Sequence, residues 1–493
     1  MLLDALRQAP ADAVALADGY RTVTYGALPQ LLQYELVWLR ASGAERHALL
    51  AANGVAWALA DLALHAGHLF AVPLPGSFTA AQMGHALDDA GIDAVLTDDP
   101  SDAQSLLAGW RYDGRSPVSG LHRYRRQLDA ASRPIAPPGT CKVTYTSGST
   151  SNPKGVCLAA ATLDAIAAAL ADATASLPVT RHLCVLPLAT LLENVGGLYA
   201  PLLRGATCIL PPQSETGMSY GGLDAGKLLA TLTREQPHSL ILVPELLQVL
   251  VTAAERGWRC PASLLFVAVG GAKVALDLLG RAAAVGLPVY EGYGLSECAS
   301  VVCLNTPSAR RAGTVGRPLP HVRVRVDEAG QVHVAGNAML GYLGEPASTR
   351  RAEIATGDIG AFDADGFLQL QGRSGNRFIT SFGRNVSPEW IESEVSQRLG
   401  SRPVLACGEA RPYVVLLVGA AAQDLPDAVV TAAIDGANAA LPDYARIRRW
   451  ARAPQPFSFA DGTLTANGRL RRPEILARAS HLLDALYRVE LAS

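Results

Sequence analysis

The stretch Val143–Val156, VTYTSGSTSNPKGV, decides the fold of this chain. Val143 and Tyr145 favour a β-strand, and the strand runs into seven consecutive Ser, Thr, Gly and Asn residues. Such a loop exposes many backbone N–H and hydroxyl donors, which suit a polyphosphate. Lys154 then adds a mobile positive charge, in a chain that has only four lysines. The pattern therefore indicates a phosphate-binding loop.

The same pattern has two other interpretations. A Walker P-loop requires G-x-x-x-x-G-K-[ST], and here the lysine is followed by Gly155, so that motif is excluded. A solvated linker remains an alternative, because small polar residues are also typical of ordinary loops.

Bulk composition excludes several classes of protein. The chain has 493 residues, so we expect two or three domains. Its hydrophobic content of 49% and charged content of 17% are those of a globular protein. The formal net charge is -2, without the basic excess that binds phosphodiester backbones, so nucleic acid is not an expected partner.

Localisation is predicted from what the sequence lacks. The first twenty residues show no secretory signal pattern, and no uninterrupted apolar run reaches the roughly eighteen residues of a membrane-spanning helix. The eight cysteines are scattered without a C-x-x-C pair, which favours reduced thiols. We therefore expect a cytoplasmic protein without a transmembrane segment, as a monomer or homodimer.

Hydrophobic periodicity predicts the domain organisation. Residues 140–295 alternate short apolar runs with amphipathic helices, which indicates parallel βαβ units, and the first 100 residues alternate similarly. HVRVRVD and QVHVAG, within 321–336, predict antiparallel strands. Polar and glycine residues then cluster, and a compact α+β segment follows. We place a boundary at Arg373–Gly375, which gives domains 1–373 and 374–493, and Gly375 could act as a hinge.

Further motifs follow the loop along the chain. They are GGAKV (270–274), YEGYGLSE (290–297), GTVGRPLP (313–320), TGD (356–358), GRSGNRFITSFGRNVSPEWIE (372–392) and LTANGRLRR (464–472). Together with YTSGSTSNPKGV they resemble, in order, the motifs of the adenylate-forming superfamily, which includes acyl-CoA synthetases, peptide-synthetase adenylation domains and firefly luciferase. The resemblance spans essentially the whole chain.

This resemblance implies a fold and a reaction. The fold is α/β: a large N-terminal domain of layered αβαβα sheets with a small antiparallel β unit, then a smaller, mobile α+β domain. A carboxylate attacks the α-phosphate of ATP and releases pyrophosphate, and a thiol then displaces AMP from the acyl-adenylate. The implied cofactors are ATP, Mg²⁺ and either CoA or the phosphopantetheine thiol of an acyl carrier protein.

The resemblance also assigns roles to individual residues. The β- and γ-phosphates would be held by Thr146, Ser147, Gly148, Ser149, Thr150 and Lys154, and the α-phosphate by Ser296. Adenine and ribose would be bound by Gly271, Ala272, Glu291, Gly292, Tyr293, Gly294, Asp358 and Arg373. Tyr293 would stack on adenine and Asp358 would accept the ribose hydroxyls. Glu297 would be the metal ligand, since Mg²⁺ takes one or two carboxylates plus phosphate oxygens.

The acyl pocket is expected around residues 185–197, VLPLATLLENVGG, with Thr190, Asn194 and Gly270 as its candidate residues. Thr190 stands where the family commonly has a histidine or aromatic gate. The apolar character of the segment predicts a hydrophobic wall with a polar point, and favours an aliphatic over an aryl acid.

Arg469 departs from the family, which has a lysine in this C-terminal loop. Arginine keeps the positive charge but is wider and planar. We therefore count Lys154, Glu297 and Arg469 as the catalytic residues and expect adenylation to be retained, though slowed.

Several functions remain open. The first is an acid–thiol ligase that forms acyl-CoA, and the second is a ligase that loads a carrier protein. A third is a nucleotide- or acyl-binding pseudoenzyme, which Arg469, Thr190 and Ser151 favour and which the intact Lys154 and Glu297 oppose. A luciferase-like oxygenase has no positive sign in the sequence.

Overall fold

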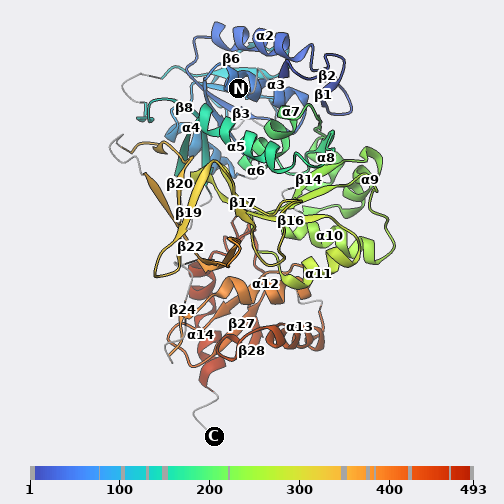
Figure 1. Cartoon of the computed structure of the whole chain (residues 1–493). Helices are drawn as coiled ribbons and strands as arrows, with labels where there is room; N and C mark the ends of the chain where they lie inside the picture. Colours follow the sequence, from blue (N-terminus) through green and yellow to red (C-terminus); the bar gives the residue numbers. More distant parts are fainter. Residues whose placement is uncertain are drawn as a thin grey trace.

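The structure is a computed structural model of the whole chain, and Figure 1 shows its arrangement. The residues it describes are 6–76, 78–101, 106–128, 133–146, 154–219, 222–345, 352–373, 378–381, 385–419, 425–465 and 468–488. Two large sheets with their helices form the upper body in Figure 1, and the segment coloured orange to red forms a smaller body below them. The predicted α/β class is confirmed.

The first large sheet has eight strands in the order β21-β9-β8-β4-β3-β5-β7-β6. Their bounds are β3 Arg46–Leu50, β4 Phe70–Pro73, β5 Ala94–Thr97, β6 Arg111–Arg115, β7 His122–Arg125, β8 Thr140–Thr146, β9 Lys154–Ala159 and β21 Gly341–Tyr342. β3 pairs in parallel with β4 and β5, with α3 (Val55–Ala66) and α4 (Ala80–Asp89) between them in sequence. The alternation predicted for the first 100 residues is therefore confirmed.

The second large sheet has nine strands in the order β18-β17-β16-β15-β14-β10-β11-β1-β2. Their bounds are β1 Val14–Ala17, β2 Thr22–Thr24, β10 Arg181–Leu183, β11 Thr207–Ile209, β14 Ser239–Leu242, β15 Phe266–Val269, β16 Val289–Leu295, β17 Ser300–Leu304 and β18 Arg317–Pro318. The core from β11 through β16 is parallel, as the βαβ pattern predicts.

Helices connect these strands and cover the sheets. They are α2 Leu28–Ala41, α5 Ala160–Ala173, α6 Leu191–Glu193, the π-helix η2 Asn194–Tyr199, α7 Ala200–Leu203, α8 Gln213–Thr216, α9 Ala225–Glu235, α10 Pro244–Glu255 and α11 Leu276–Ala284, with the 3₁₀ turn η3 Ser296–Cys298 and the short strands β12 Met218–Ser219 and β13 Gly222–Leu223. α3 is buried along nearly its whole length and contacts β1 of one sheet and β3, β4 and β8 of the other. A helix that is apolar all round belongs in such an interior layer.

One strand is absent from the sequence prediction. Residues 154–159 form β9, which pairs antiparallel with β8, and Thr146 lies opposite Lys154. β8 and β9 therefore pair as the two arms of a hairpin, whereas the sequence pattern predicted no strand between the loop and the helix that follows it. The alternation is hidden because four consecutive residues of β9, from Gly155 to Leu158, are buried.

The antiparallel unit predicted beyond residue 315 is confirmed. Its four strands, in the order β19-β20-β22-β23, are β19 Val322–Val326, β20 Gln331–Gly336, β22 Glu353–Phe362 and β23 Leu368–Arg373. All three pairings are antiparallel. Val332 and Val334 of β20 are fully buried, as expected for the inner face of an alternating strand.

The C-terminal segment has the predicted α+β composition and a core of its own. Its elements are β24 Phe378–Ile379, β25 Asn385–Val386, α12 Pro388–Arg398, β26 Val404–Cys407, β27 Val414–Val418, α13 Asp427–Ala440, η6 Asp443–Ala445, β28 Ile447–Arg452 and α14 Arg472–Arg488. Ile391 and Val395 of α12 pack with Leu416 of β27 in that core. The boundary at Arg373–Gly375 stays a prediction, and Gly375 lies outside the described residues.

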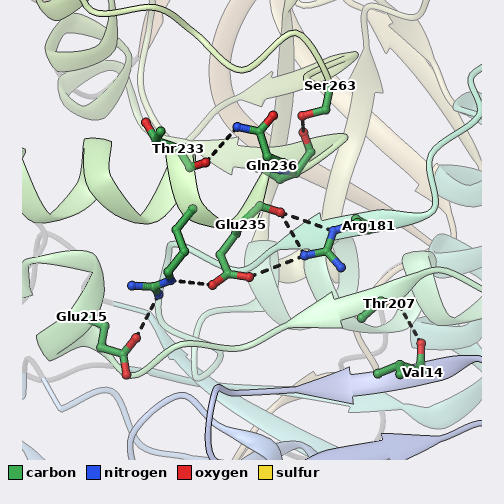
Figure 2. A network of polar contacts seen from close by, with 10 residues as sticks. Val14, Arg181, Thr207, Glu215, Thr233, Glu235, Gln236 and Ser263 are labelled. Carbon is green, nitrogen blue, oxygen red and sulfur yellow. Dashed lines mark hydrogen bonds and ion pairs between the residues drawn. The ribbon is translucent and has the colours of Figure 1, made fainter.

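A polar hollow of ≈ 510 Å³ lies over the β1, β2 and β11 side of the nine-stranded sheet. Figure 2 shows the polar network beside it. The Arg181 guanidinium donates to the backbone oxygen of Glu235 (2.9 Å), and Arg234 bridges the carboxylates of Glu235 (2.8 Å) and Glu215 (3.0 Å). Because these charges already compensate one another, the network serves to hold α8 and α9 against the sheet.

The helices in the described part of the chain include none with the length and apolar character needed to span a membrane.

A buried ion pair joins the layers of the N-terminal domain. The Lys142 ammonium group in β8 lies 2.7 Å from the Asp61 carboxylate of α3, and both side chains are at most 1% exposed. Lys142 also donates to Asn194 Oδ1 (2.5 Å) and to the Tyr199 hydroxyl (3.0 Å), both in η2. Asn194 and Tyr199 in turn donate to the second oxygen of Asp61, at 2.9 and 2.7 Å. One strand, one helix and one π-helix therefore share a closed polar network.

Removing the charge at Lys142 should destabilise this domain strongly. In Lys142→Met the Asp61 carboxylate would stay buried without its counter-charge, a change that typically costs about 3–5 kcal/mol. Urea denaturation followed by tryptophan fluorescence should show that loss in the free energy of unfolding. The control Lys227→Met removes an exposed lysine whose ammonium donates to the Ser214 backbone oxygen, and it should change stability by less than about 0.5 kcal/mol. Equal stability of the two variants would contradict the role given to the network.

Candidate active site

Lys154 and Glu297 are brought close together by a third residue, Tyr342. The Tyr342 hydroxyl donates to Glu297 Oε1 at 2.9 Å, and the Lys154 ammonium lies 5.4 Å from the centre of the Tyr342 ring. Tyr342 is placed there because β21 pairs with β9. Backbone bonds hold the surrounding chain, since Met339 N donates to Glu297 O (2.7 Å) and Leu343 N to Gly155 O (2.8 Å). A cation and a carboxylate thus both contact one tyrosine side chain.

The rest of the expected phosphate loop is only partly described. Ser147, Gly148, Ser149 and Thr150 lie outside the described residues, and of Thr146 only the backbone is described, at the end of β8. Lys154 is exposed at the start of β9, directly across the hairpin from Thr146. Ser296 begins the 3₁₀ turn η3 next to Glu297 and is partly exposed. The structure therefore places Lys154, Ser296 and Glu297 in one region.

Tyr293, Asp358 and Arg373 form a second cluster. The Tyr293 hydroxyl donates to Asp358 Oδ2 (2.6 Å), and Arg373 Nε donates to Asp358 Oδ1 (2.8 Å). Asp358 and Arg373 face each other across the β22–β23 pair. Burial, followed by the negative charge of Asp358, raises the pKa of Tyr293 well above its usual value, so the phenol stays protonated. Both Asp358 oxygens are thus held in fixed positions.

The loop Gly270–Val274 follows β15 and lies at the carboxyl end of the parallel strands, where ligands of open α/β sheets are usually bound. Gly271 has φ +86°, a conformation that favours glycine, and Ala272 is exposed. Glu291 lies beneath this loop, 7% exposed, and its Oε1 accepts from Val274 N at 3.4 Å. Burial raises the pKa of Glu291 to about 7, against the lowering effect of the Val274 amide and the Lys273 charge. Glu291 therefore supports the loop from within.

Two other glycines of the YEGYGLSE motif are required by close packing within the sheet. A Cβ at Gly294 would lie 1.7 Å from the Ser300 backbone oxygen, and one at Gly292 would lie 3.0 Å from Leu304 Cδ1. Both contacts are with β17, which pairs antiparallel with β16. These glycines therefore let β17 approach the strand that carries Tyr293.

Arg469 reaches this region from the C-terminal domain. Its Nη2 donates to the Gly271 backbone oxygen at 3.2 Å, across 198 residues of sequence. Desolvation of the guanidinium, and then the positive charge of Arg373, lower the pKa of Arg469, while Asp358 opposes the shift. Arg469 as a whole residue is exposed, but its guanidinium group is close enough to Arg373 and Asp358 to interact with their charges. The structure therefore gathers Arg469, Arg373 and Asp358 on one side of the loop.

The domains also meet through the face of α12. Ala275 N donates to Gln397 Oε1 (3.1 Å), and Ser393 Oγ donates to the Lys273 backbone oxygen (3.4 Å). The Lys273 ammonium lies 5.7 Å from the centre of a ring of Trp390. The small domain thus packs directly on the loop that is expected to border adenine.

An apolar cavity of ≈ 70 Å³ lies on the helical side of the nine-stranded sheet. The described residues that line it include Leu192, Gly196 and Ala200 of the helical segment and Ile241, Ala268 and Val301 of the strands. Ala268 lies two residues before Gly270, so the strand that leads into the 270–274 loop forms part of the cavity wall. A Cβ at Gly196 would approach Ile241 Cδ1 to 2.8 Å, so this glycine keeps part of the space open.

The three residues expected to form the acyl pocket do not line this cavity. Asn194 is 1% exposed and its amide is fully used by Lys142 and Asp61. Thr190 precedes α6 and donates to the Pro187 backbone oxygen at 2.7 Å. Gly270 lies at the end of β15, beyond Ala268. The predicted segment is therefore adjacent to the cavity, but Leu192 and Gly196 are the residues of that segment that line it.

Sequence reasoning missed Tyr342 altogether. It lies in GYLGE, 45 residues beyond Glu297, with no motif to mark it. Only the pairing of β21 with β9 brings it to the site, and a two-residue strand has too few residues to show a periodic pattern.

The fold and this cluster of charged residues define the architecture of adenylate-forming proteins. The chain belongs to the family of AMP-binding enzymes, because its residues 3–343 match the model of that family.

Curated relatives carry several different acid substrates in their names. Feruloyl-CoA synthase of Amycolatopsis sp is 30% identical over 417 residues, which is 78% of this chain and 80% of that protein. The long-chain-fatty-acid–CoA ligase FadD15 of Mycobacterium bovis is 29% identical over 265 residues, 48% of this chain. That match spans only 44% of the length of FadD15.

Solved structures share the fold along nearly the whole chain. The anthranilate CoA ligase AuaEII in complex with anthranoyl-AMP has a TM-score of 0.78 at 20% identity and covers 98% of each chain. The o-succinylbenzoate CoA synthetase of Bacillus subtilis, in complex with its acyl-adenylate, has a TM-score of 0.73 at 21% identity, covering 96% of this chain and 97% of that one.

The hydroxyl of Tyr342 should contribute to binding of Mg·ATP. Tyr342→Phe keeps the ring beside Lys154 but removes the hydrogen bond that positions Glu297, and a bond to a charged group is worth about 1.5–3 kcal/mol. We expect the Kd for Mg·ATP, measured calorimetrically without acid substrate, to rise by about tenfold or more. Tyr20→Phe, at an 84% exposed tyrosine, is the control and should leave Kd unchanged. An unchanged Kd in Tyr342→Phe would show that the hydroxyl does not position Glu297 for this ligand.

Proposed function

We propose that this chain is an AMP-forming acid–thiol ligase, which activates a carboxylic acid with ATP and transfers the acyl group to CoA. The observation that carries the proposal is the convergence of three groups where the two domains meet. Lys154 and Glu297 flank Tyr342, Asp358 is held between Tyr293 and Arg373, and Arg469 reaches Gly271 from the small domain. Membership of the AMP-binding family supports the same reaction class.

In the first half-reaction a carboxylate oxygen of the acid attacks the α-phosphorus of ATP, and pyrophosphate leaves. Lys154 neutralises the charge of the departing phosphates, and Arg469 offsets the repulsion between the acid and the α-phosphate. Asp358, fixed by Tyr293 and Arg373, accepts hydrogen bonds from the ribose hydroxyls. Glu297 has the carboxylate chemistry that suits Mg²⁺, which neutralises phosphate charge when bound.

In the second half-reaction the thiolate attacks the acyl carbon and AMP leaves. The small domain touches the 271–275 segment through a few polar contacts. This limited contact supports a rotation of the domain between the two half-reactions, about a hinge near Gly375. We propose CoA as the acceptor, with a carrier-protein phosphopantetheine as the second candidate.

The acid is proposed to have an apolar, aliphatic body. The cavity is lined mostly by leucine, isoleucine, valine and alanine residues, with His182 and Ser239 also in its wall, and it has the apolar character expected of an acyl-binding site. The names of the relatives include fatty, aryl and succinylbenzoate acids, so the test below compares these classes directly.

Carboxylate-dependent exchange of labelled pyrophosphate into ATP tests the function. We expect exchange with Mg²⁺ and an aliphatic acid, weaker exchange with aryl acids, and acyl-CoA formation when CoA is added. Lys154→Ala should lower the exchange rate by about 10²–10³, as expected for loss of a charged transition-state contact. Lys227→Ala, at a lysine far along the chain on α9, is the matched control. Mg·ATP binding without exchange for any acid in the panel would favour the pseudoenzyme, and acyl transfer only to a carrier protein would favour the second acceptor.

The arginine at position 469 should slow adenylation more than thioester formation. Arg469→Lys restores a compact charge on a thinner side chain, so we expect the exchange rate to rise severalfold. Transfer from a preformed acyl-adenylate to CoA should not change, because the rotated small domain would carry this loop away from the site. A fall in the exchange rate would instead show that the site is adapted to the guanidinium, whose second nitrogen then matters for binding.

A further inference from the structure

Among the residues that the structure describes, three potential metal ligands cluster outside the proposed reaction site. His182 lies in β10 and Cys184 directly follows that strand, and residues two apart in an extended chain point to the same side. Glu193, the last residue of α6, faces them from the start of the π-helix η2. One ligand atom from each residue lies within 4.8 Å of the other two, and all three residues are buried.

Three polar atoms of this cluster are buried without a well-formed hydrogen bond. Among the residues that the structure describes, none makes a hydrogen bond of good geometry to His182 Nε2 or to either oxygen of Glu193, although the side chains are only 3% and 0% exposed. His182 Nε2 lies 3.5 Å from Glu193 Oε1. Leaving a buried carboxylate unpaired is costly, and buried charges in proteins are normally paired or coordinate metals. In the Lys142–Asp61 network, by contrast, the ammonium group and both carboxylate oxygens have hydrogen-bond partners.

The residues around the cluster leave His182 Nε2 and the Glu193 carboxylate available to bind a cation. His182 Nδ1 lies 2.9 Å from Ser239 Oγ, and when Nδ1–H donates to that oxygen the lone pair of Nε2 points to Glu193. Gly197 supplies the space, because a Cβ there would lie 2.5 Å from Glu193 Oε1 and 2.9 Å from His182 Nε2. Gly197 belongs to η2, and π-helical turns often mark functional sites.

We propose that His182, Cys184 and Glu193 bind a divalent transition-metal ion, with Zn²⁺ as the best fit. A nitrogen, a thiolate and a carboxylate are all ligands that Zn²⁺ accepts, whereas Mg²⁺ and Ca²⁺ prefer oxygen alone. The ionised Cys184 and Glu193 carry two negative charges and would neutralise the ion. Two ligands about 2.0–2.1 Å from a tetrahedral ion are about 3.4 Å apart, close to the 3.5 Å between His182 Nε2 and Glu193 Oε1.

The apolar cavity borders the cluster on the His182 side. His182 and Ser239 form part of the cavity wall, so a water molecule could complete a set of three protein ligands there. Binding displaces the proton of Cys184, whose thiol donates to the Gly197 backbone oxygen at 3.2 Å. The site is separate from Glu297, the expected Mg²⁺ ligand, and it would attach β10 to the helical segment behind the acyl cavity.

Metal binding by the intact, untagged chain tests the proposal. The protein is treated with a chelator, desalted, loaded with Zn²⁺ or Co²⁺ in excess Mg²⁺, and desalted again. We expect mass spectrometry to show about one bound ion per chain. The absorption spectrum of the Co²⁺ form should show a thiolate-to-metal charge-transfer band and the intense visible bands of a tetrahedral site. Cys184→Ser should abolish the charge-transfer band, and Glu193→Gln should weaken Zn²⁺ binding by more than the roughly 10–100-fold that loss of an outer-sphere partner costs.

Cys208→Ser is the matched control. Cys208 is equally buried and lies opposite His182 in the neighbouring strand β11, but it is not part of the cluster. Its substitution should leave both metal content and the charge-transfer band unchanged. The proposal is overturned if the folded wild-type chain retains neither Zn²⁺ nor Co²⁺, which would mean that Glu193 stays protonated, or if Cys184→Ser and the wild type give the same Co²⁺ spectrum. The wild-type result decides the question even if a variant does not fold.

Discussion

The contact between Lys142 and Asp61 is the constraint on which the N-terminal domain depends. It sets the spacing between β8 and α3, and through Asn194 and Tyr199 it sets the position of the π-helix as well. β8 leads into the expected phosphate loop, and η2 forms part of the helical segment beside the acyl cavity. A single buried charge pair therefore holds the strand that leads to the proposed phosphate loop and the helical segment beside the proposed acyl cavity at a fixed distance. Such a pair specifies geometry more than it adds stability, because both charges lose their hydration.

Much of the fold could be predicted from the sequence, because its signals are local. The alternation in HVRVRVD and QVHVAG identified β19 and β20, and the alternating apolar runs and helices of residues 140–295 identified the parallel βαβ units. β9 was missed because its buried residues show no alternation. Lys142 gave no signal either, since a lysine in a strand is normally taken to face solvent. Its burial depends on Asp61 and Tyr199, which lie 81 and 57 residues away.

The candidate site was predictable to the extent that its residues lie in motifs. Asp358 and Arg373 came from separate motifs, and the structure brings them together as a cross-strand pair with Tyr293. The roles of Glu291 and Asn194 depend on their burial, which a motif does not encode. Glu291 supports the 270–274 loop, and Asn194 belongs to the polar network of Lys142 and Asp61. Tyr342 and the cluster of His182, Cys184 and Glu193 arise from tertiary packing alone, and no spacing in the sequence indicates them.

Three hydrogen bonds from the small domain to the N-terminal domain end on backbone atoms of the 271–275 segment. Arg469 binds the carbonyl of Gly271, Ser393 binds that of Lys273, and Gln397 accepts from the amide of Ala275. Each of these partners is a main-chain atom, which every amino acid other than proline supplies in the same way. Substitutions along this loop can therefore leave these three hydrogen bonds in place as long as the backbone keeps its course, whereas the contact of Lys273 with Trp390 depends on the side chain. If the last 120 or so residues were grafted onto a relative, these bonds would require that the relative's loop follow the same backbone course, and they would place few requirements on its side chains.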